Sequence, residues 1–253
     1  MSVKRGSIPK PDPDAALSPA DFAEVFKTIP TDWILIGGQA VAYWATYYRL
    51  DGAVTSKDID FWGKNKLKEL AKKLNTEVHT PHRYERTWLT GVVRITASGQ
   101  KTTIELLHKV PGLDVENVIQ VALPVPVNDD GTELHVLTPV SLLLTKLYAL
   151  RHFDQTDRND LTHLQIAIAA SREFIAEAIQ KNVKFGLWNC NRVMVAQKIK
   201  QHRQMEEQYG FKLLEAVPID HIKRLADTPS FVGHDKLAKF VTEHWARATE
   251  GKV

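Results

Sequence analysis

Two short motifs, about twenty residues apart, constrain this chain more than any other feature of it. Gly37-Gly38 ends the apolar run Trp33–Ile36, and Asp58-Ile59-Asp60 opens a second apolar run. Successive side chains of a strand point to opposite faces, so both carboxylates should share one face, about 7 Å apart. Carboxylates at that spacing repel each other unless a cation lies between them. The motif therefore predicts a site for a hard divalent metal such as Mg²⁺, which is often held by one or two carboxylates and substrate phosphates.

A third acidic residue, Glu105, interrupts the apolar alternation of the predicted strand Thr102–Leu107. Because a buried charge is costly unless it is paired or coordinated, we expect Glu105 to join Asp58 and Asp60 around one or two metal ions. The glycine pair adds a phosphate-binding element, since glycine lets the backbone approach a phosphate and the next helix presents its N-terminal N–H groups. Together these elements predict phosphoryl or nucleotidyl transfer.

The composition is that of a globular protein, with 253 residues, 43% of them apolar and 25% charged. The length suits one large or two modest domains. A net charge of +3 argues neither for nor against a nucleic-acid partner. The single cysteine, Cys190, excludes an intramolecular disulfide and fits a reducing compartment. Since we find no signal peptide and no apolar stretch of membrane-spanning length, we expect a cytoplasmic protein that does not interact with membranes.

The pattern along the chain predicts an α/β (α+β) fold in which a mixed sheet flanked by helices is followed by an all-helical domain. Residues 1–17 contain several prolines and are predicted to be a flexible N-terminus. The α/β domain should cover 18–137, and the helical domain should cover 138–253. Strands are predicted at 33–36, 58–62, 92–96, 102–107, 121–127 and 134–137. Helices are predicted at 19–29, 39–49, around 67–74, and at 139–153, 158–170, 172–182, 190–208, 219–227 and 234–248.

The order of these motifs resembles the nucleotidyltransferase superfamily whose founding member is DNA polymerase beta. It looks more closely like the AbiEii-type branch, the toxin component of type IV toxin–antitoxin and phage-defence systems. The resemblance covers roughly residues 30–165 and implies a nucleotidyltransferase-type sheet. The matching segments are Gly37-Gly38-Gln39-Ala40, Thr55-Ser56-Lys57-Asp58-Ile59-Asp60-Phe61, Lys146-Leu147-Tyr148-Ala149-Leu150 and Arg158-Asn159-Asp160-Leu161-Thr162-His163-Leu164.

The resemblance also implies roles for single residues. Asp58 and Asp60 would bind Mg²⁺, or alternatively Mn²⁺, and Glu105 would activate the acceptor hydroxyl or complete a second metal site. Lys146 would contact the phosphates of an NTP substrate, and Asp160 would orient Lys146 or lie beside the nucleotide. The remaining residues assigned to nucleotide binding are Gly37, Gly38, Thr55, Lys57, Arg151 and Arg158.

The implied reaction transfers a nucleoside monophosphate from an NTP to a hydroxyl group of RNA, tRNA especially, or of a protein. The implied partner is a cognate antitoxin. The chain departs from the family pattern at three positions: Gly38 replaces a serine, Asn159 a basic residue and His163 an acid. The departures at Asn159 and His163 favour an alternative, a non-catalytic member that binds nucleotide, nucleic acid or a partner. Another alternative is a small-molecule (antibiotic) nucleotidyltransferase.

The acidic and basic residues also have purely structural interpretations. Glu105 would then form a surface ion pair with one of three basic residues, Lys101, Lys109 or Arg94. Lys146 would be a solvated lysine on an otherwise apolar helix, and Asp160 a first-turn acid favoured by the helix dipole.

Overall fold

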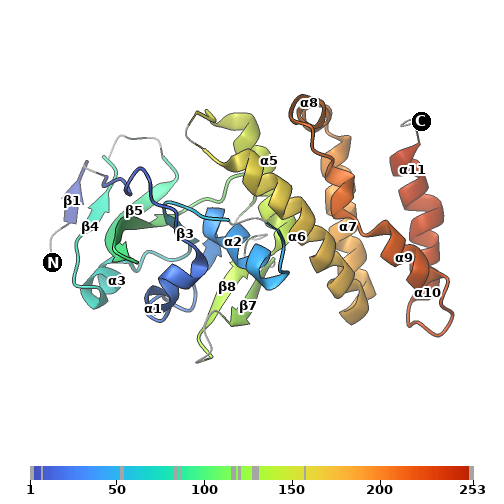
Figure 1. Ribbon diagram of the computed structural model, residues 1–253, viewed down its shortest axis with the longest axis horizontal. Coiled ribbons are helices and arrows are strands. Elements are labelled where there is room, and N and C mark those ends of the chain that lie inside the picture. Colours follow the sequence, from blue (N-terminus) through green and yellow to red (C-terminus); the bar gives the residue numbers. More distant parts are fainter. Residues whose placement is uncertain are drawn as a thin grey trace. The chain divides into compact units, whose positions relative to one another are not determined.

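The computed structural model describes residues 3–6, 8–51, 54–82, 85, 87–114, 118, 121–126, 131–156 and 158–250. Contacts between residues divide the chain into two compact units, Met1–His163 and Leu164–Val253 (Figure 1). The first unit contains a mixed sheet with helices, and the second unit is helical in its described part. The predicted mixed α/β class is therefore confirmed.

The sheet of the first unit has eight strands among the described residues, in the order β1-β4-β5-β6-β3-β2-β8-β7. The strands are β1 Val3–Arg5, β2 Ile34–Ile36, β3 Ile59–Trp62, β4 Val78–Thr80, β5 Leu89–Ala97, β6 Gln100–Leu107, β7 Ala122–Pro126 and β8 Glu133–Leu137. Strand β3 runs antiparallel to β2 and parallel to β6, so the sheet is mixed. The predicted strands are all present within a few residues; β1 and β4, three residues each, were not predicted.

Three central strands set the geometry on which a site can be built. Strand β2 is buried along its whole length, and Trp33 just before it packs on Phe61 of β3 with ring centroids 5.5 Å apart. Strand β3 pairs with β6 in a register that puts Asp60 opposite Glu105. Because neighbouring strands lie about 5 Å apart, these partners bring two carboxylates from distant parts of the sequence side by side.

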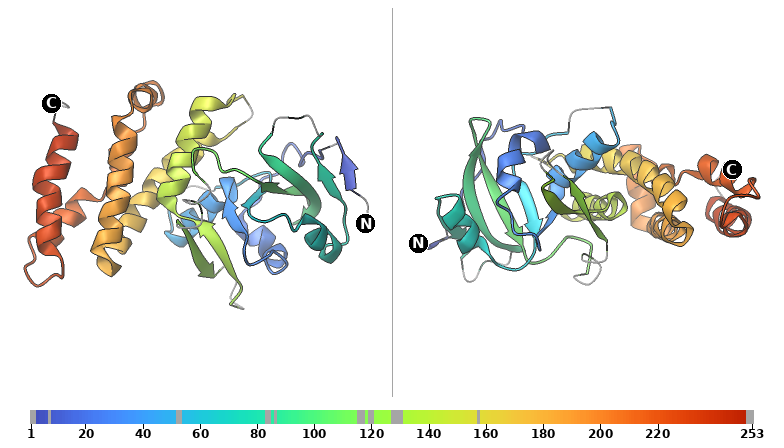
Figure 2. Two further views of the ribbon diagram at one scale, coloured as in Figure 1. Left: turned by 180° about the vertical axis from the view of Figure 1, so that it is seen from behind. Right: turned by 90° about the horizontal axis from the view of Figure 1, so that it is seen from below.

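Helices cover the sheet of the first unit at several points. They are η1 Pro19–Phe22, α1 Ala23–Phe26, α2 Gly37–Tyr47, α3 Leu67–Lys73, α5 Pro139–His152 and the first residues of α6 Asp160–Lys181. Helix α5 contacts α2 and runs next to it in both figures (Figures 1 and 2). This compact unit therefore extends to His163, beyond the predicted domain boundary at residue 137, because α5 packs with the α/β part.

The N-terminal segment, predicted to be flexible, makes defined contacts in its described part. Strand β1 pairs in parallel with β4, and Leu17 forms an isolated antiparallel bridge with Ser56. Ala15 and Leu17 are buried. The segment thus reaches from the far edge of the sheet to the residues just before β3.

In its described part, the second unit consists of the remainder of α6 and six further helical segments of different lengths. These are α7 Val183–Lys198, α8 Lys200–Tyr209, η2 Leu213–Ala216, α9 Ile219–Ala226, α10 His234–Lys239, and the continuous stretch of η3 Phe240–Trp245 and α11 Ala246–Thr249. The predicted helices 158–170 and 172–182 form one helix, since Ser171 donates to the Ala167 carbonyl and the chain does not break. The predicted helix 190–208 is interrupted at Ile199, which has an extended backbone.

Cys190 is buried in α7, and burial raises the pKa of its thiol to about 12. In this environment Cys190 packs as a small apolar side chain. Among the described residues, no helix combines the length and the apolar character needed to cross a membrane.

Candidate functional site

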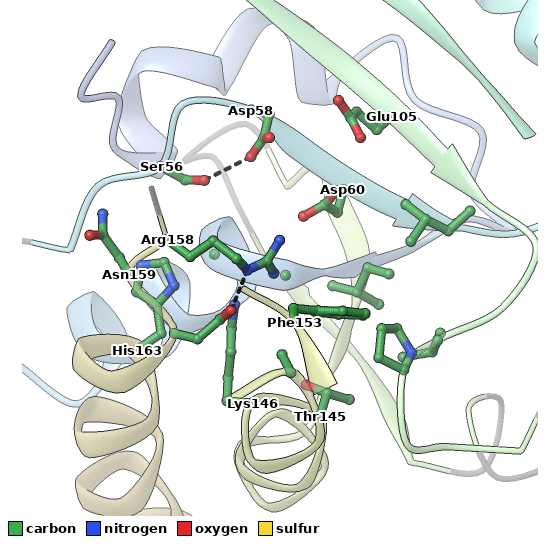
Figure 3. A pocket seen from close by; sticks show the side chains of 18 of the residues that line it. Ser56, Asp58, Asp60, Glu105, Thr145, Lys146, Phe153, Arg158, Asn159 and His163 are labelled. Atoms are coloured by element: carbon green, nitrogen blue, oxygen red, sulfur yellow. Dashed lines mark hydrogen bonds and ion pairs between the residues drawn. The ribbon is translucent and has the colours of Figure 1, made fainter. Parts of the chain in front are cut away.

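The first unit contains a pocket of about 690 Å³ where the β2–α2 turn, the residues before β3, strand β6 and helices α5 and α6 meet (Figure 3). Nearly all of the residues predicted from the sequence line it: Gly37, Gly38, Thr55, Lys57, Asp58, Asp60, Glu105, Lys146, Arg158 and Asp160. The exception is Arg151, which is exposed on α5 and does not line this pocket. The pocket therefore joins motifs that lie more than a hundred residues apart in the sequence.

Three carboxylates lie on one side of the pocket (Figure 3). Asp58 precedes β3, Asp60 lies within it, and Glu105 is the register partner of Asp60 in β6. Burial, followed by repulsion from Asp58 and Glu105, raises the pKa of Asp60 well above its ordinary value. Burial and the charge of Asp58 also raise the pKa of Glu105 to about 7. The acids are thus close enough to oppose one another's ionisation.

The three acids have the ligand chemistry of a site for a divalent metal ion. Among the described residues, no three His, Cys, Asp or Glu side chains are arranged to hold a metal ion as they stand. The ligand chemistry nevertheless suits Mg²⁺ or Mn²⁺, since the acids offer only hard carboxylate oxygens. Their raised pKa values show a concentration of negative charge that a cation would relieve. The residues present fit a divalent cation, provided that the side chains draw together around it.

Two cations and one buried acid form the opposite side of the pocket. Lys146 donates from Nζ to Asp160 Oδ1 at 2.8 Å, and Arg158 donates from Nε to Asp160 Oδ2 at 2.5 Å. The guanidinium of Arg158 lies 5.0 Å above the centre of the Phe153 ring. Burial alone would raise the pKa of Asp160, but Lys146 and Arg158 outweigh it and lower that pKa. Asp160 is therefore ionised at neutral pH and holds both cations at the pocket.

The glycine turn lies directly against the acids. Gly37 has φ +68, and a Cβ atom there would lie 2.0 Å from Asp60 Oδ2. Only glycine combines this left-handed backbone with such a close approach. The turn also begins α2, an eleven-residue helix, so its first N–H groups are near the acidic residues. The glycine pair has the place in the fold that a phosphate-binding turn requires.

His163 is a pocket residue that the sequence presented only as a departure from a motif. It is buried, and burial together with the charge of Lys146 lowers the pKa of its imidazole to about 4. The ring is therefore neutral at pH 7, and it hydrogen-bonds to the backbone of Thr55. The signal available in the sequence was spacing, because His163 follows Asp160 by three residues and so shares its helix face.

Ser56, Trp88 and Phe153 also line the pocket and were not predicted as site residues. Ser56 had a usable signal in its position two residues before Asp58. The two aromatic residues had none. Trp88 directly precedes β5 and Phe153 directly follows α5, and they meet only in the folded chain, with ring centroids 5.6 Å apart.

Comparison with protein-family models and with curated proteins finds no match. Among solved structures, an antigenic nucleotidyltransferase-like protein from Paracoccidioides brasiliensis is 14% identical with a TM-score of 0.42, covering 69% of this chain and 94% of that one. The solution structure of the antibiotic-resistance factor ANT(2'')-Ia is 12% identical with a TM-score of 0.35, covering 75% of this chain and 92% of that one.

Proposed function

We propose that this protein is a Mg²⁺-dependent nucleotidyltransferase that moves a nucleoside monophosphate from an NTP to a hydroxyl group. The observation that carries the proposal is the register pairing of Asp60 with Glu105, with Asp58 in the same pocket. Lys146 and Arg158, on the other side, supply the positive charge that a triphosphate needs. A pocket with acids on one side and cations on the other suits a metal-bound polyphosphate.

In this proposal the three acids hold Mg²⁺, which when bound would neutralise charge on the triphosphate and on the leaving pyrophosphate. Lys146 and Arg158 bind phosphate oxygens, and Asp160 keeps the two cations in place. The N–H groups at the start of α2, exposed by Gly37 and Gly38, add further donors. Most of the rate enhancement then comes from positioning and charge stabilisation, because no covalent enzyme intermediate is needed.

The transfer step conserves atoms and charge without any further reactant. The oxygen of the acceptor hydroxyl forms a bond to the α-phosphorus, and the bond between the α-phosphorus and the bridging oxygen breaks. Pyrophosphate leaves with the electron pair of that bond. The hydroxyl proton passes to the carboxylate of Glu105, which lies in the same pocket as the other two acids.

The acceptor and the biological role are narrower parts of the proposal. We propose RNA, tRNA in particular, or a protein hydroxyl as the acceptor, and a role as the toxin of a type IV toxin–antitoxin or phage-defence system. The support for these is the order of sequence motifs from Gly37 to His163, and a cognate antitoxin is the corresponding partner.

The test incubates the protein with each NTP, labelled at the α-phosphate, with Mg²⁺ and either pooled tRNA or cell lysate. We expect label on an RNA or protein band for the wild type and none for Asp58→Ala or Asp60→Asn. Asp32→Asn, which removes an exposed partner of Lys66 away from the pocket, is the matched control and should keep activity. Label transfer that survives both active-site substitutions would refute the metal-site assignment.

A non-catalytic role in nucleotide binding is the second candidate. One observation favours it: as they stand, no three potential ligands among the described residues are arranged around a metal position. Tight NTP binding with no transfer to any acceptor would select this candidate. Transfer to an aminoglycoside but to neither RNA nor protein would instead select a small-molecule nucleotidyltransferase.

A further inference from the structure

The hydroxyl group of Ser56 lies in the pocket, next to the first acid of the Asp58-Ile59-Asp60 motif. Its Oγ donates a hydrogen bond to Asp58 Oδ1 at 3.0 Å (Figure 3). A carboxylate with one oxygen held in this way no longer rotates freely about its terminal bond. The direction of its second oxygen is therefore fixed as well.

Ser56 lies in space that a side chain at residue 38 would otherwise fill. A Cβ atom built on Gly38 would lie 2.7 Å from Ser56 Oγ and 3.0 Å from Ser56 Cβ. Contacts that short force one of the two groups to move. The absence of a side chain at Gly38 is thus what lets the Ser56 hydroxyl lie between the glycine turn and Asp58.

The backbone of Ser56 is held by Leu17, in the N-terminal segment between β1 and η1. Ser56 N–H donates to the Leu17 carbonyl at 3.0 Å, and Leu17 N–H donates to the Ser56 carbonyl at 3.2 Å. The Leu17 carbonyl also accepts from Nε2 of the buried Gln39 at 2.8 Å. Because Gln39 directly follows the glycine pair, these bonds tie Ser56 to the same turn whose open space it occupies.

We infer that Ser56 is a positioning residue that orients Asp58 for divalent-metal binding, and that Gly38 is glycine to make room for it. The inference rests on the proposed function in so far as Asp58 is a metal ligand. Hydrogen-bond partners behind a ligand fix its orientation, and their loss commonly weakens metal binding by 10- to 100-fold. Ser56, just before β3, thereby places a hydroxyl group next to the glycine turn, which has no side chain at residue 38.

The first test measures the Mg²⁺ affinity of the metal-free protein by titrating Mg²⁺ and following the rise in melting temperature. We expect Ser56→Ala to weaken apparent Mg²⁺ binding by about 10-fold or more, and Ser56→Thr, which keeps a hydroxyl, to recover most of it. The control is Ser98→Ala, which removes another serine-to-carboxylate bond, to Asp21, outside the pocket and should leave the affinity unchanged. An affinity for Ser56→Ala within twofold of the wild type would overturn the inference.

The second test asks whether Gly38 acts through Ser56. Gly38→Ala should weaken Mg²⁺ binding in the wild-type background and have a clearly smaller effect in a Ser56→Gly background. In that background Ser56 Oγ and Cβ are gone, and His163 Cε1, 3.0 Å from the added Cβ, is the close contact that stays. Equal effects in the two backgrounds would overturn the link between Gly38 and Ser56. A wild-type protein that binds Mg²⁺ but transfers no nucleotide would refute the proposed function, and the Mg²⁺ titration would still decide the inference about Ser56.

Discussion

The acidic side chains on the two sides of the pocket have pKa values shifted in opposite directions. On one side, Asp60 and Glu105 have raised pKa values because they are buried near each other and near Asp58. On the other side, Asp160 is ionised between Lys146 and Arg158. The first group destabilises the folded chain at neutral pH in the absence of a cation, and the second depends on all its members being present.

The repulsion among the acids predicts a dependence of stability on pH. The folded chain holds the Glu105 proton more tightly than the unfolded chain, because its pKa rises from 4.5 to about 7. The associated stability is therefore greatest below pH 4.5 and is lost as the pH rises to about 7. In EDTA at pH 8, Glu105→Gln should melt roughly 2–4 °C above the wild type, with the difference vanishing near pH 4.5. A variant that melts below the wild type at pH 8 would contradict this sign.

The shared anion predicts a second effect at the residue scale. Asp160→Asn should lower the free energy of unfolding by about 3–5 kcal/mol, because it leaves the buried Lys146 ammonium without its partner. The matched control is Asp32→Asn, which breaks the more exposed pair with Lys66 and should cost less than about 1 kcal/mol. Urea denaturation at pH 7 measures both. Similar losses in the two variants would show that Asp160 does not hold the cations as described.

Among the structural elements, the turn from β2 into α2 tolerates few changes of sequence. Its first glycine has a left-handed backbone and touches the Asp60 carboxylate, so both the conformation and the space demand glycine. Gly99, in the β5–β6 turn, has the same sign of φ but open space around it. Comparing Gly37 with Gly99 therefore separates two effects of an added side chain, which are strain in the backbone and displacement of the Asp60 carboxylate.

Alanine substitution at these two glycines should therefore give different results. Gly99→Ala should lose about 1–2 kcal/mol of stability, the cost of a left-handed alanine, and keep its response to Mg²⁺. Gly37→Ala should lose more and should also lose the Mg²⁺-dependent rise in melting temperature, because its Cβ displaces Asp60. Thermal melts with and without Mg²⁺ check both. A normal Mg²⁺ response in Gly37→Ala would argue against Asp60 as a ligand.

Helices and strands could be predicted from the sequence where a short run of neighbouring residues determines them. The central strands were predictable from apolar runs, and the start of α5 from Thr138-Pro139. The continuity of α6 through Ser171 was not predictable, since a polar residue in mid-helix can either end a helix or bond back to it. The three-residue strands β1 and β4 have too few residues for an alternation to stand out.

At the scale of the whole molecule, the first unit holds every residue of the candidate site. The acids were predictable because charged residues within apolar runs can be recognised from the sequence alone. The pairing of Asp60 with Glu105 was expected, while the roles of Ser56 and His163 emerged only from contacts between segments distant in sequence. For the molecule as a whole, we propose that the pocket carries out nucleotidyl transfer rather than simple phosphoryl transfer.

The most direct test of that claim compares one NTP labelled at the α-phosphate with the same NTP labelled at the γ-phosphate, in parallel reactions with Mg²⁺ and the acceptor. We expect the α-label to join the acceptor and the γ-label to leave as pyrophosphate, and we expect Asp60→Asn to abolish both outcomes. Transfer of the γ-label to the acceptor, or α-label transfer undiminished in Asp60→Asn, would contradict that claim.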